Sequence, residues 1–278
     1  MRRLSFRNER SLYKRTCDFC HKSIVSIIAP EKQFPVYCPE DWWSDKWDPT
    51  EYGSEYDFSR PFFAQYKALM RRTPWVSLQT IHSTMVNSEY TNMCGTSKNC
   101  YLTTHADHNE DCAYASGLKY SRDCVDVLMT QSSELSYECV NVMSGHRNVY
   151  SVDCKDCHDV YFSKNLVGCN DCIGYVNLRN KSHCIFNEEY SKEEYEKKRK
   201  ELNIESRTGL AKTKAWAEAL WLKYPQKFYH GTNNVNVSGD YIYNSKNAKS
   251  SYELIGAEDC KFCHFLSTKT SKDCYDYT

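Results

Sequence analysis

Nine pairs of residues recur along the chain at intervals close to twelve, and this period constrains the fold more than any other feature of the sequence. The first member is Asn or Asp in seven of the nine pairs, and the second is always Ser, Cys or Val. The pairs are Asn87-Ser88, Asn99-Cys100, Asp111-Cys112, Asp123-Cys124, Leu135-Ser136, Asn148-Val149, Asp159-Val160, Asp171-Cys172 and His183-Cys184. Every interval is 12 residues except one of 13 and one of 11, which fall on either side of Asn148-Val149. A fixed period of this kind is typical of repeat folds.

A second lane of mostly slender side chains lies six residues after the first. Its members are Cys94, Ala106, Leu118, Thr130, Val142, Cys154, Leu166, Leu178 and Tyr190. Slender groups suit an interior where equivalent residues of successive coils stack about 4.8 Å apart, and Asn and Asp tolerate unusual turn geometry. The apolar spacing of helical repeats is absent from the sequence. We therefore predict a mainly β fold, a β-solenoid of roughly 12-residue repeats. Whether twelve residues make a full coil or half of one stays open.

The period pauses after Tyr190, where a helical insertion is predicted. Ser191-Lys192-Glu193-Glu194 has the pattern of a capping box that begins a helix. A second helix is expected over residues 208–223, and the period then resumes less regularly, at Asn247-Ala248, Asp259-Cys260 and Asp273-Cys274.

Five segments follow from these boundaries. They are a zinc ribbon with a Trp-rich lid (1–50), a helical linker (51–86), the β-solenoid repeats (87–190), the helical insertion (191–235) and the resumed, incomplete repeats (236–278). A final coil without a cap exposes a strand edge, which natural solenoids avoid. Continuation in a longer chain or end-to-end self-association is therefore expected.

Two short motifs near the start predict a zinc site. Cys17 and Cys20 are separated by two residues, as are Cys38 and Asp41, which is the spacing of two metal-binding turns. Thiolates and a carboxylate can complete a tetrahedral Zn²⁺ site, so Cys17, Cys20, Cys38 and Asp41 are the predicted ligands. A degenerate ribbon that has lost its metal is the alternative. Trp42, Trp43 and Trp47 are predicted to form an apolar lid over this small domain.

A second zinc site at Cys154, Cys157, Cys169 and Cys172 also has suitable spacing, but the repeat alone explains that spacing. We therefore leave this second site open.

Sixteen cysteines suit either disulfides outside the cell or thiols and metal ligands inside it. The first ten residues contain no apolar leader, and no apolar run reaches the ~20 residues that span a bilayer. We therefore predict a cytoplasmic protein with reduced cysteines and no membrane partner. Lys and Arg balance Asp and Glu at 36 each, so no overall charge favours nucleic acid. A basic start does include Arg2, Arg3, Arg7, Arg10, Lys14 and Arg15.

The sequence resembles a family of uncharacterised zinc-ribbon and cysteine-rich repeat proteins from uncultured ultrasmall bacteria. The resemblance rests on Arg7-Asn8-Glu9-Arg10, Cys17-Asp18-Phe19-Cys20, residues 42–48, residues 177–181 and residues 190–195. Members usually carry a fourth cysteine where this chain has Asp41, and they often continue beyond residue 278. Some carry a CaiB/BaiF label, but the resemblance implies no established activity.

A non-catalytic, zinc-binding scaffold or interaction module that recognises a protein partner is the leading prediction. Nucleic-acid binding through the basic start and the ribbon is the alternative. A solenoid enzyme acting on carbohydrate or acyl groups is a further alternative. No catalytic residue and no cofactor other than zinc is predicted, because His105, Asp107 and His108 fit an exposed polar turn better than an active site.

Overall fold

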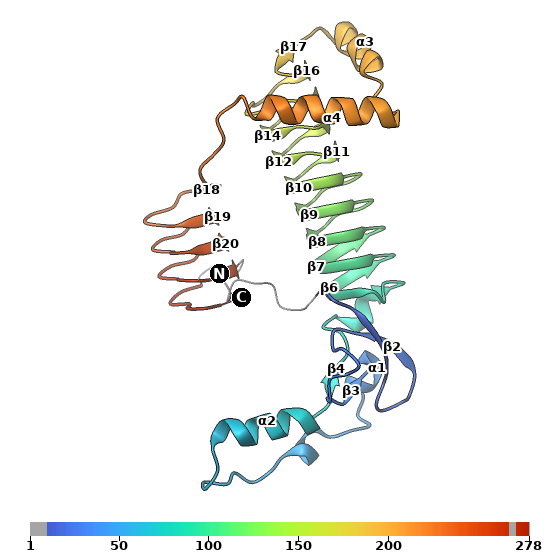
Figure 1. Cartoon of the computed structure of the whole chain (residues 1–278), viewed down its shortest axis with the longest axis vertical. Coiled ribbons are helices and arrows are strands. Elements are labelled where there is room, and N and C mark those ends of the chain that lie inside the picture. The colour runs from blue at the N-terminus through green and yellow to red at the C-terminus, as the bar shows by residue number, and fades with distance from the viewer. Residues whose placement is uncertain (1–9, 267–270, 278) are drawn as a thin grey trace. The chain divides into compact units, whose positions relative to one another are not determined.

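The computed structural model describes residues 10–266 and 271–277 (Figure 1). The chain divides into two compact units; the first extends to Tyr224 and the second begins at Pro225. The fold is mainly β, as predicted, with 40% of residues in strands and 18% in helices. None of the helices in the described residues is long and apolar enough to cross a membrane.

The first unit begins with short elements that surround the predicted metal site. β1 and β2 form an antiparallel hairpin, and β3 pairs in parallel with β4. The elements are β1 (Tyr13–Thr16), β2 (Ser23–Ser26), β3 (Val36–Tyr37), α1 (Pro39–Trp42), η2 (Pro49–Tyr52), α2 (Phe62–Arg72), β4 (Trp75–Val76) and η3 (His82–Thr84). α2 lies within the predicted helical linker (51–86), and none of its residues is buried.

A stack of parallel strands follows, and it settles the size of the coil. Each residue pairs with the one twelve positions later, as Cys94 does with Ala106 and Cys172 with Cys184. Twelve residues therefore make one complete coil. The strands are β5 (Met85–Val86), β6 (Thr91–Lys98), β7 (Tyr101–Glu110), β8 (Ala113–Lys119), β9 (Val125–Gln131), β10 (Tyr137–Met143), β11 (His146–Val149), β12 (Val152–Lys155), β13 (His158–Tyr161), β14 (Lys164–Val167), β15 (Asn170–Ile173) and β16 (Ser182–Ile185).

Each coil has four sides of three residues. Asn99, Leu102, His105 and His108 all have φ between 50° and 56°, so every third residue is left-handed and turns a corner. The residue after each corner points inward, and nearly all of these are buried. Asn and Asp tolerate this conformation, and their side chains also link successive coils. Asn87 Nδ2 donates to Asn99 Oδ1 at 3.0 Å, and Asn99 Nδ2 donates to Asp111 Oδ1 at 2.8 Å.

The intervals of 13 and 11 residues predicted around Asn148 are wrong. Asn148 pairs with Val160, and His146 pairs with His158, so the register is twelve on both sides. The polar Asn148 faces the interior because Gly145 leaves room for it. A Cβ at Gly145 would lie 2.1 Å from Asn148 Nδ2. That amide group donates to the carbonyl of Cys157 at 3.2 Å.

The predicted helical insertion covers the end of this first array. The short β17 (Glu188–Glu189) pairs antiparallel with β16, and α3 (Lys192–Leu202) and α4 (Arg207–Trp221) follow. Ser191 and Glu194 form the predicted capping box. A buried cluster joins the helices to the last coils, and Figure 1 shows α4 lying across them. Its buried members are Phe162, Ile173, Ile185, Tyr195, Ile204 and Ala217. The insertion therefore acts as the cap that a solenoid needs.

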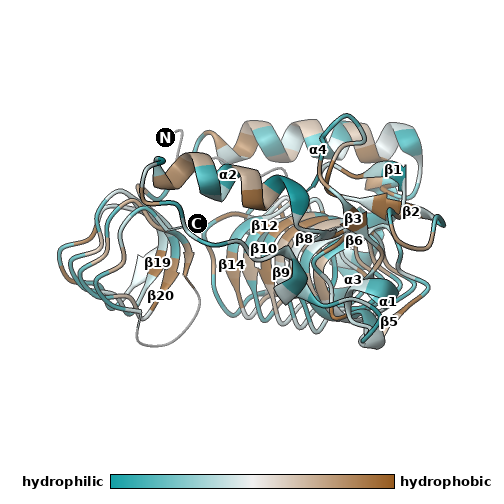
Figure 2. Ribbon diagram, turned by 90° about the horizontal axis from the view of Figure 1, so that it is seen from below, coloured by the Kyte–Doolittle hydropathy of each residue, from teal (hydrophilic) through white to brown (hydrophobic). Residues whose placement is uncertain are grey.

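The second unit is a shorter array of the same kind. β18 (Gly231–Thr232), β19 (Gly239–Tyr243), β20 (Ser251–Ile255) and β21 (His264–Leu266) pair in parallel. Figure 2 shows brown, apolar stretches on β19 and β20, in line with the buried Ile242 and Leu254. The predicted 14-residue step is confirmed, because Glu258 bridges to Lys272.

Candidate metal centre

Four potential metal ligands come from two places in the first unit. Cys17 and Cys20 lie in the turn that joins β1 to β2. Cys38 follows β3 and precedes α1, which carries Asp41. The hairpin turn is closed by backbone hydrogen bonds from Cys17 N to Lys22 O (2.9 Å) and from His21 N to Cys17 O (3.0 Å). His21 has a left-handed φ of 61° and an exposed side chain, so it does not join the four.

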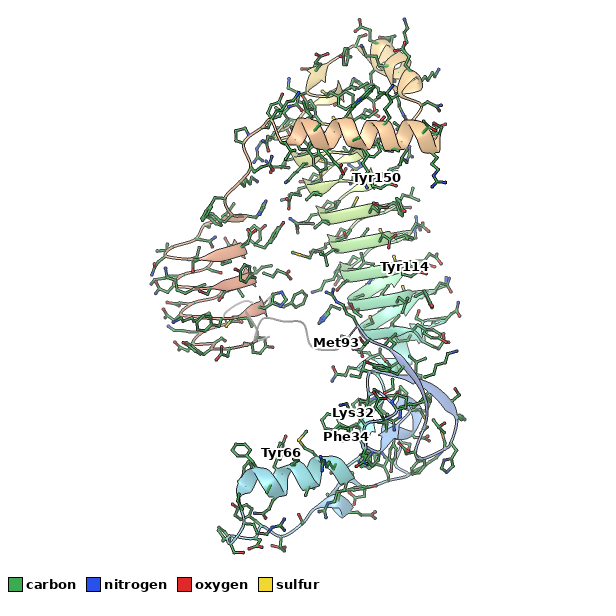
Figure 3. The ribbon with its side chains drawn as sticks, in the orientation of Figure 1. Lys32, Phe34, Tyr66, Met93, Tyr114 and Tyr150 are labelled. Carbon is green, nitrogen blue, oxygen red and sulfur yellow. The ribbon has the colours of Figure 1, made fainter. Side chains whose placement is uncertain are left out.

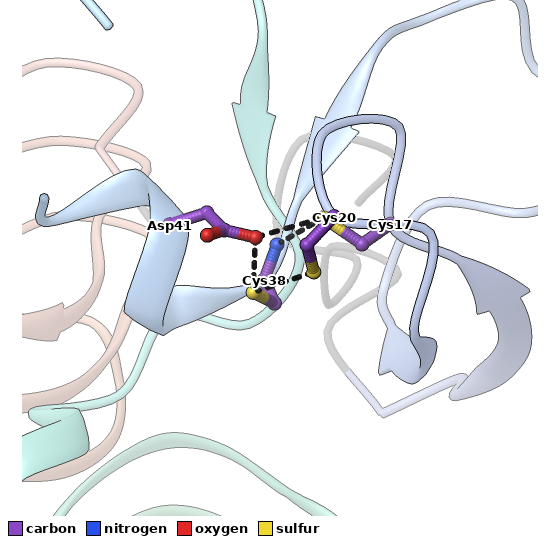
Figure 4. Close-up of side chains that lie close together, drawn as sticks. All are labelled: Cys17, Cys20, Cys38 and Asp41. Atoms are coloured by element: carbon purple, nitrogen blue, oxygen red, sulfur yellow. Dashed lines mark hydrogen bonds between the residues drawn. The ribbon is translucent and has the colours of Figure 1, made fainter. Parts of the chain in front are cut away.

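The four ligand atoms all lie within 4.8 Å of one another (Figure 4). Cys20 Sγ is 3.8 Å from Cys38 Sγ, and Asp41 Oδ2 is 2.9 Å from Cys38 Sγ and 3.4 Å from Cys17 Sγ. The predicted residues are therefore brought together, and this cluster could hold a metal ion. No second group of three or more such residues occurs elsewhere in residues 10–266 and 271–277.

Three of the four ligand residues are buried, and backbone N–H groups donate hydrogen bonds to one of the sulfurs. Cys17, Cys38 and Asp41 are buried, while Cys20 is partly exposed. The backbone N–H groups of Phe19 and Cys38 point at Cys17 Sγ, at 3.4 and 3.2 Å. Burial raises the pKa of the Cys38 thiol, and its hydrogen bond to Asp41 raises it further. Hydrogen bonds from the thiols of Cys20 and Cys38 lower the pKa of the Asp41 carboxyl. The raised pKa values of Cys20 and Cys38 favour protonated thiols at these two residues without a cation, and a bound cation would replace those protons.

The two ligand pairs have different local structures. The first pair occupies a hairpin turn, whereas Cys38 and Asp41 flank the start of a helix with Pro39 in its first turn. Proline suits that position because its missing N–H would have no partner there. The cluster is thus built from a turn and a helix start, and the zinc ribbon itself stays a prediction.

The tryptophan-rich segment contributes a lid, as predicted, but not with all three rings. Trp47 packs against Trp42 at 5.0 Å and against Tyr37 at 5.4 Å between ring centroids. These rings adjoin Cys17 and Cys38 in one apolar cluster. Trp43, in contrast, is 73% exposed and lies outside the lid.

The cysteines of the second predicted zinc site are part of the solenoid interior. Cys154, Cys157, Cys169 and Cys172 are buried in the core of the first array. Residues three apart lie on neighbouring sides of one coil, and residues twelve apart stack in adjacent coils. The fold therefore explains their spacing without a metal. All sixteen cysteines are free.

The remaining sequence candidates do not form a site. His108 Nδ1 lies 3.1 Å from Asp107 Oδ2, and both side chains are about half exposed. Of the basic residues at the start, Arg2, Arg3 and Arg7 lie outside the described residues. Arg10 donates to Ser116 Oγ at 3.0 Å, and Arg15 pairs with Asp18 at 3.1 Å.

The comparisons with family models and with curated proteins give no match. The resemblance to the zinc-ribbon repeat family therefore stays a prediction. Among solved structures, the chain is similar to UDP-N-acetylglucosamine O-acyltransferase (LpxA) from Moraxella catarrhalis. The similarity has a TM-score of 0.17 and 12% sequence identity over 39% of this chain. It covers 62% of that enzyme, less than two thirds of its length.

Proposed function

We propose that Cys17, Cys20, Cys38 and Asp41 bind a structural Zn²⁺ ion, and that the chain is a non-catalytic scaffold that recognises a protein partner. The observation that carries the metal proposal is the convergence of three sulfurs and one carboxylate oxygen within 4.8 Å.

Zinc suits these donors for two reasons. A tetrahedral site with Zn–S bonds of about 2.3 Å has S···S edges of about 3.8 Å, and Cys20 and Cys38 already show this separation. Thiolates alone also suit Cu(I), but the harder carboxylate oxygen of Asp41 favours Zn²⁺. Four protein donors fill a tetrahedral shell and leave no position for a substrate, which is the arrangement of a structural site.

The partner surface that we favour is one corner of the first array. Tyr101, Tyr114 and Tyr137 are each at least 38% exposed there. The rings of Tyr90, Tyr101 and Tyr114 lie 5.4 and 5.8 Å apart, and Figure 3 shows Tyr114 on the flank of the array. A neighbouring groove of about 370 Å³ is partly lined by Leu102, Leu128 and Val140. Exposed tyrosines beside an apolar groove are typical of protein-binding surfaces.

We expect the purified protein to contain about one zinc per chain. The Cys17→Ser variant should lose most of this zinc, because it removes a buried ligand. Cys274→Ser should keep it, because Cys274 is a partly exposed cysteine outside the cluster. Elemental analysis after gel filtration measures both. Equal zinc in the two variants, or none in the parent protein, would contradict the metal proposal.

The partner surface can be tested by photo-crosslinking in cells. A photoreactive phenylalanine analogue at Tyr114 should give a discrete crosslinked species with another protein. The same residue at Tyr120 should give none, because Tyr120 lies six residues away in the same coil, on the opposite corner. Both side chains are more than half exposed, so accessibility is matched. Crosslinking at Tyr120 but not at Tyr114 would assign binding to the other flank.

A further inference from the structure

An exposed aromatic knob extends from the loop before α2 into the helix. We define it as Tyr56, Phe58, Phe62, Phe63 and Tyr66. Phe58 is 92% exposed and Phe63 is 80% exposed, although the rings pack on one another. The Tyr56 and Phe58 centroids are 4.8 Å apart, and those of Phe62 and Phe63 are 5.4 Å apart. Contiguous exposed aromatic side chains often mark interaction surfaces.

The helix that carries the knob is amphipathic. Phe62, Tyr66, Leu69 and Met70 recur at helical spacing and share one face. Lys67 follows Phe63 by one turn and lies at the edge of that face, whereas Arg71 is a second turn further on and lies on the opposite, polar face. Figure 2 shows both brown and teal stretches on α2. No residue of the helix is buried, although Leu69 and Met70 are partly covered, so the exposed part of this face is Phe62, Phe63 and Tyr66.

The charges around the knob favour an anionic surface. α2 contains no acidic residue, and neither Lys67 nor Arg71 pairs with another described residue. Arg72 is engaged with the backbone carbonyls of Tyr52 and Gly53. The acidic residues closest in sequence are Glu51, Glu55 and Asp57; Asp57 Oδ1 accepts hydrogen bonds from the N–H and the hydroxyl of Ser59. Residues 51–72 contain four basic and three acidic side chains, a net charge of +1.

A lipid surface fits these features better than a second copy of the chain. A two-fold contact must be self-complementary, and Lys67, at the middle of the helix, would find no acidic residue of α2 opposite it. A bilayer interface accepts protruding aromatic rings without a matching groove. Its anionic headgroups attract Lys and Arg at the rim of the inserted face.

We propose that α2 and the aromatic knob bind peripherally to anionic lipid bilayers, with the rings at the acyl boundary and Lys67 and Arg71 on the headgroup phosphates. None of the knob residues is a ligand of the metal cluster. The proposal departs from the prediction of no membrane partner, because it would place the array and its partner surface at a membrane without a membrane-spanning segment.

Flotation of the full chain with vesicles tests the proposal. Vesicles of phosphatidylcholine with phosphatidylserine should bind the protein at least about tenfold more tightly than phosphatidylcholine alone, and high salt should reduce binding. Lys67→Glu with Arg71→Glu should weaken binding by at least about 25-fold, at roughly fivefold per lost charge. Phe58→Ser with Phe63→Ser should weaken it at least about tenfold.

The matched control is Tyr120→Ser, which removes an exposed ring from the first array and should leave binding unchanged. All variants should keep their zinc content and circular dichroism, because none of these residues is buried. Failure to float with phosphatidylserine vesicles would overturn the proposal. A concentration-dependent dimer that is lost in the Phe58→Ser, Phe63→Ser variant would also overturn it, by assigning the face to a second copy.

Discussion

Replacing Asp41 with alanine should weaken zinc binding by about 100-fold or more, whereas Asp41→Cys should strengthen it. Asp41 Oδ2 is the only oxygen donor in the cluster and lies 2.9 Å from Cys38 Sγ. The alanine variant leaves three thiolates and an open coordination position, and ligand loss should cost more than the 10- to 100-fold of an outer-shell change. A fourth thiolate is a softer donor and a common ligand of structural zinc. Competition with a chromophoric chelator measures both affinities.

The neighbouring carboxylate provides the control for this experiment. The Glu40 side chain is 59% exposed and lies 3.3 Å from His82; it hydrogen-bonds the Cys38 thiol but is not one of the four ligands. Glu40→Ala should therefore bind zinc within about tenfold of the parent protein, because it removes a contact to a ligand and not a ligand. If Asp41→Ala and Glu40→Ala bind zinc equally, Asp41 is not a ligand and the fourth donor must be sought elsewhere. Weaker binding in Asp41→Cys would show that the site cannot accommodate a fourth sulfur.

The twelve-residue period predicted the coil because stacking forces equivalent positions to share one environment. Cys100, Cys112 and Cys124 recur at twelve and are all buried in one lane of the first array. Asx residues recur at the corner before that lane, where left-handed backbone and side-chain ladders both favour them. Both requirements, a slender buried residue and a left-handed corner before it, apply in every coil, so the sequence repeats the same residue types every twelve positions.

The three-residue period within each coil is less evident in the sequence than the twelve-residue period. The four inward lanes accept Cys, Ser, Thr, Ala, Val and Asn, so no single residue type marks them. Corners such as Leu102 and Tyr114 are not Asx residues, although their φ values are 50° and 54°. A pair of cysteines separated by two residues occurs in two different structures here. Cys154 and Cys157, three apart, are inward residues on neighbouring sides of one coil. Cys17 and Cys20, with the same spacing, form a metal-binding turn. Spacing alone does not separate these cases.

The metal cluster was predictable because the ligands of each pair are close in sequence. The exposure of α2 was not predictable from the sequence. The amphipathic period of Phe62, Tyr66 and Leu69 is the same whether a helix faces a core or a partner. Only the three-dimensional arrangement shows that no residue of α2 is buried. The error at Asn148 has a similar origin. A polar residue usually favours a corner, but Gly145, three residues earlier, leaves interior space for Asn148.

Gly145 and Asn148 share one interior space, so substitutions at these two positions test the register. Gly145→Ala should destabilise the first array by about 2–3 kcal/mol, because overpacking a dense interior typically costs this much. The new Cβ would lie 2.1 Å from Asn148 Nδ2 and 2.8 Å from Val142 Cγ1. The matched control is Gly95→Ala, whose Cβ would approach no atom closer than 3.0 Å and would meet only the side chains of Asp107 and Ile81. We expect it to cost less than about 1 kcal/mol.

A second substitution at Asn148 should remove most of the penalty. Serine is the residue that the same lane carries one coil earlier, at Ser136, and it is too short to reach the new methyl group. The Gly145→Ala, Asn148→Ser double variant should therefore be more stable than Gly145→Ala alone. The coupling between the two sites should be about 2 kcal/mol in urea unfolding. Additive effects would mean that the two residues do not share interior space. In that case the space beside Gly145 would not be the reason why Asn148 faces the interior.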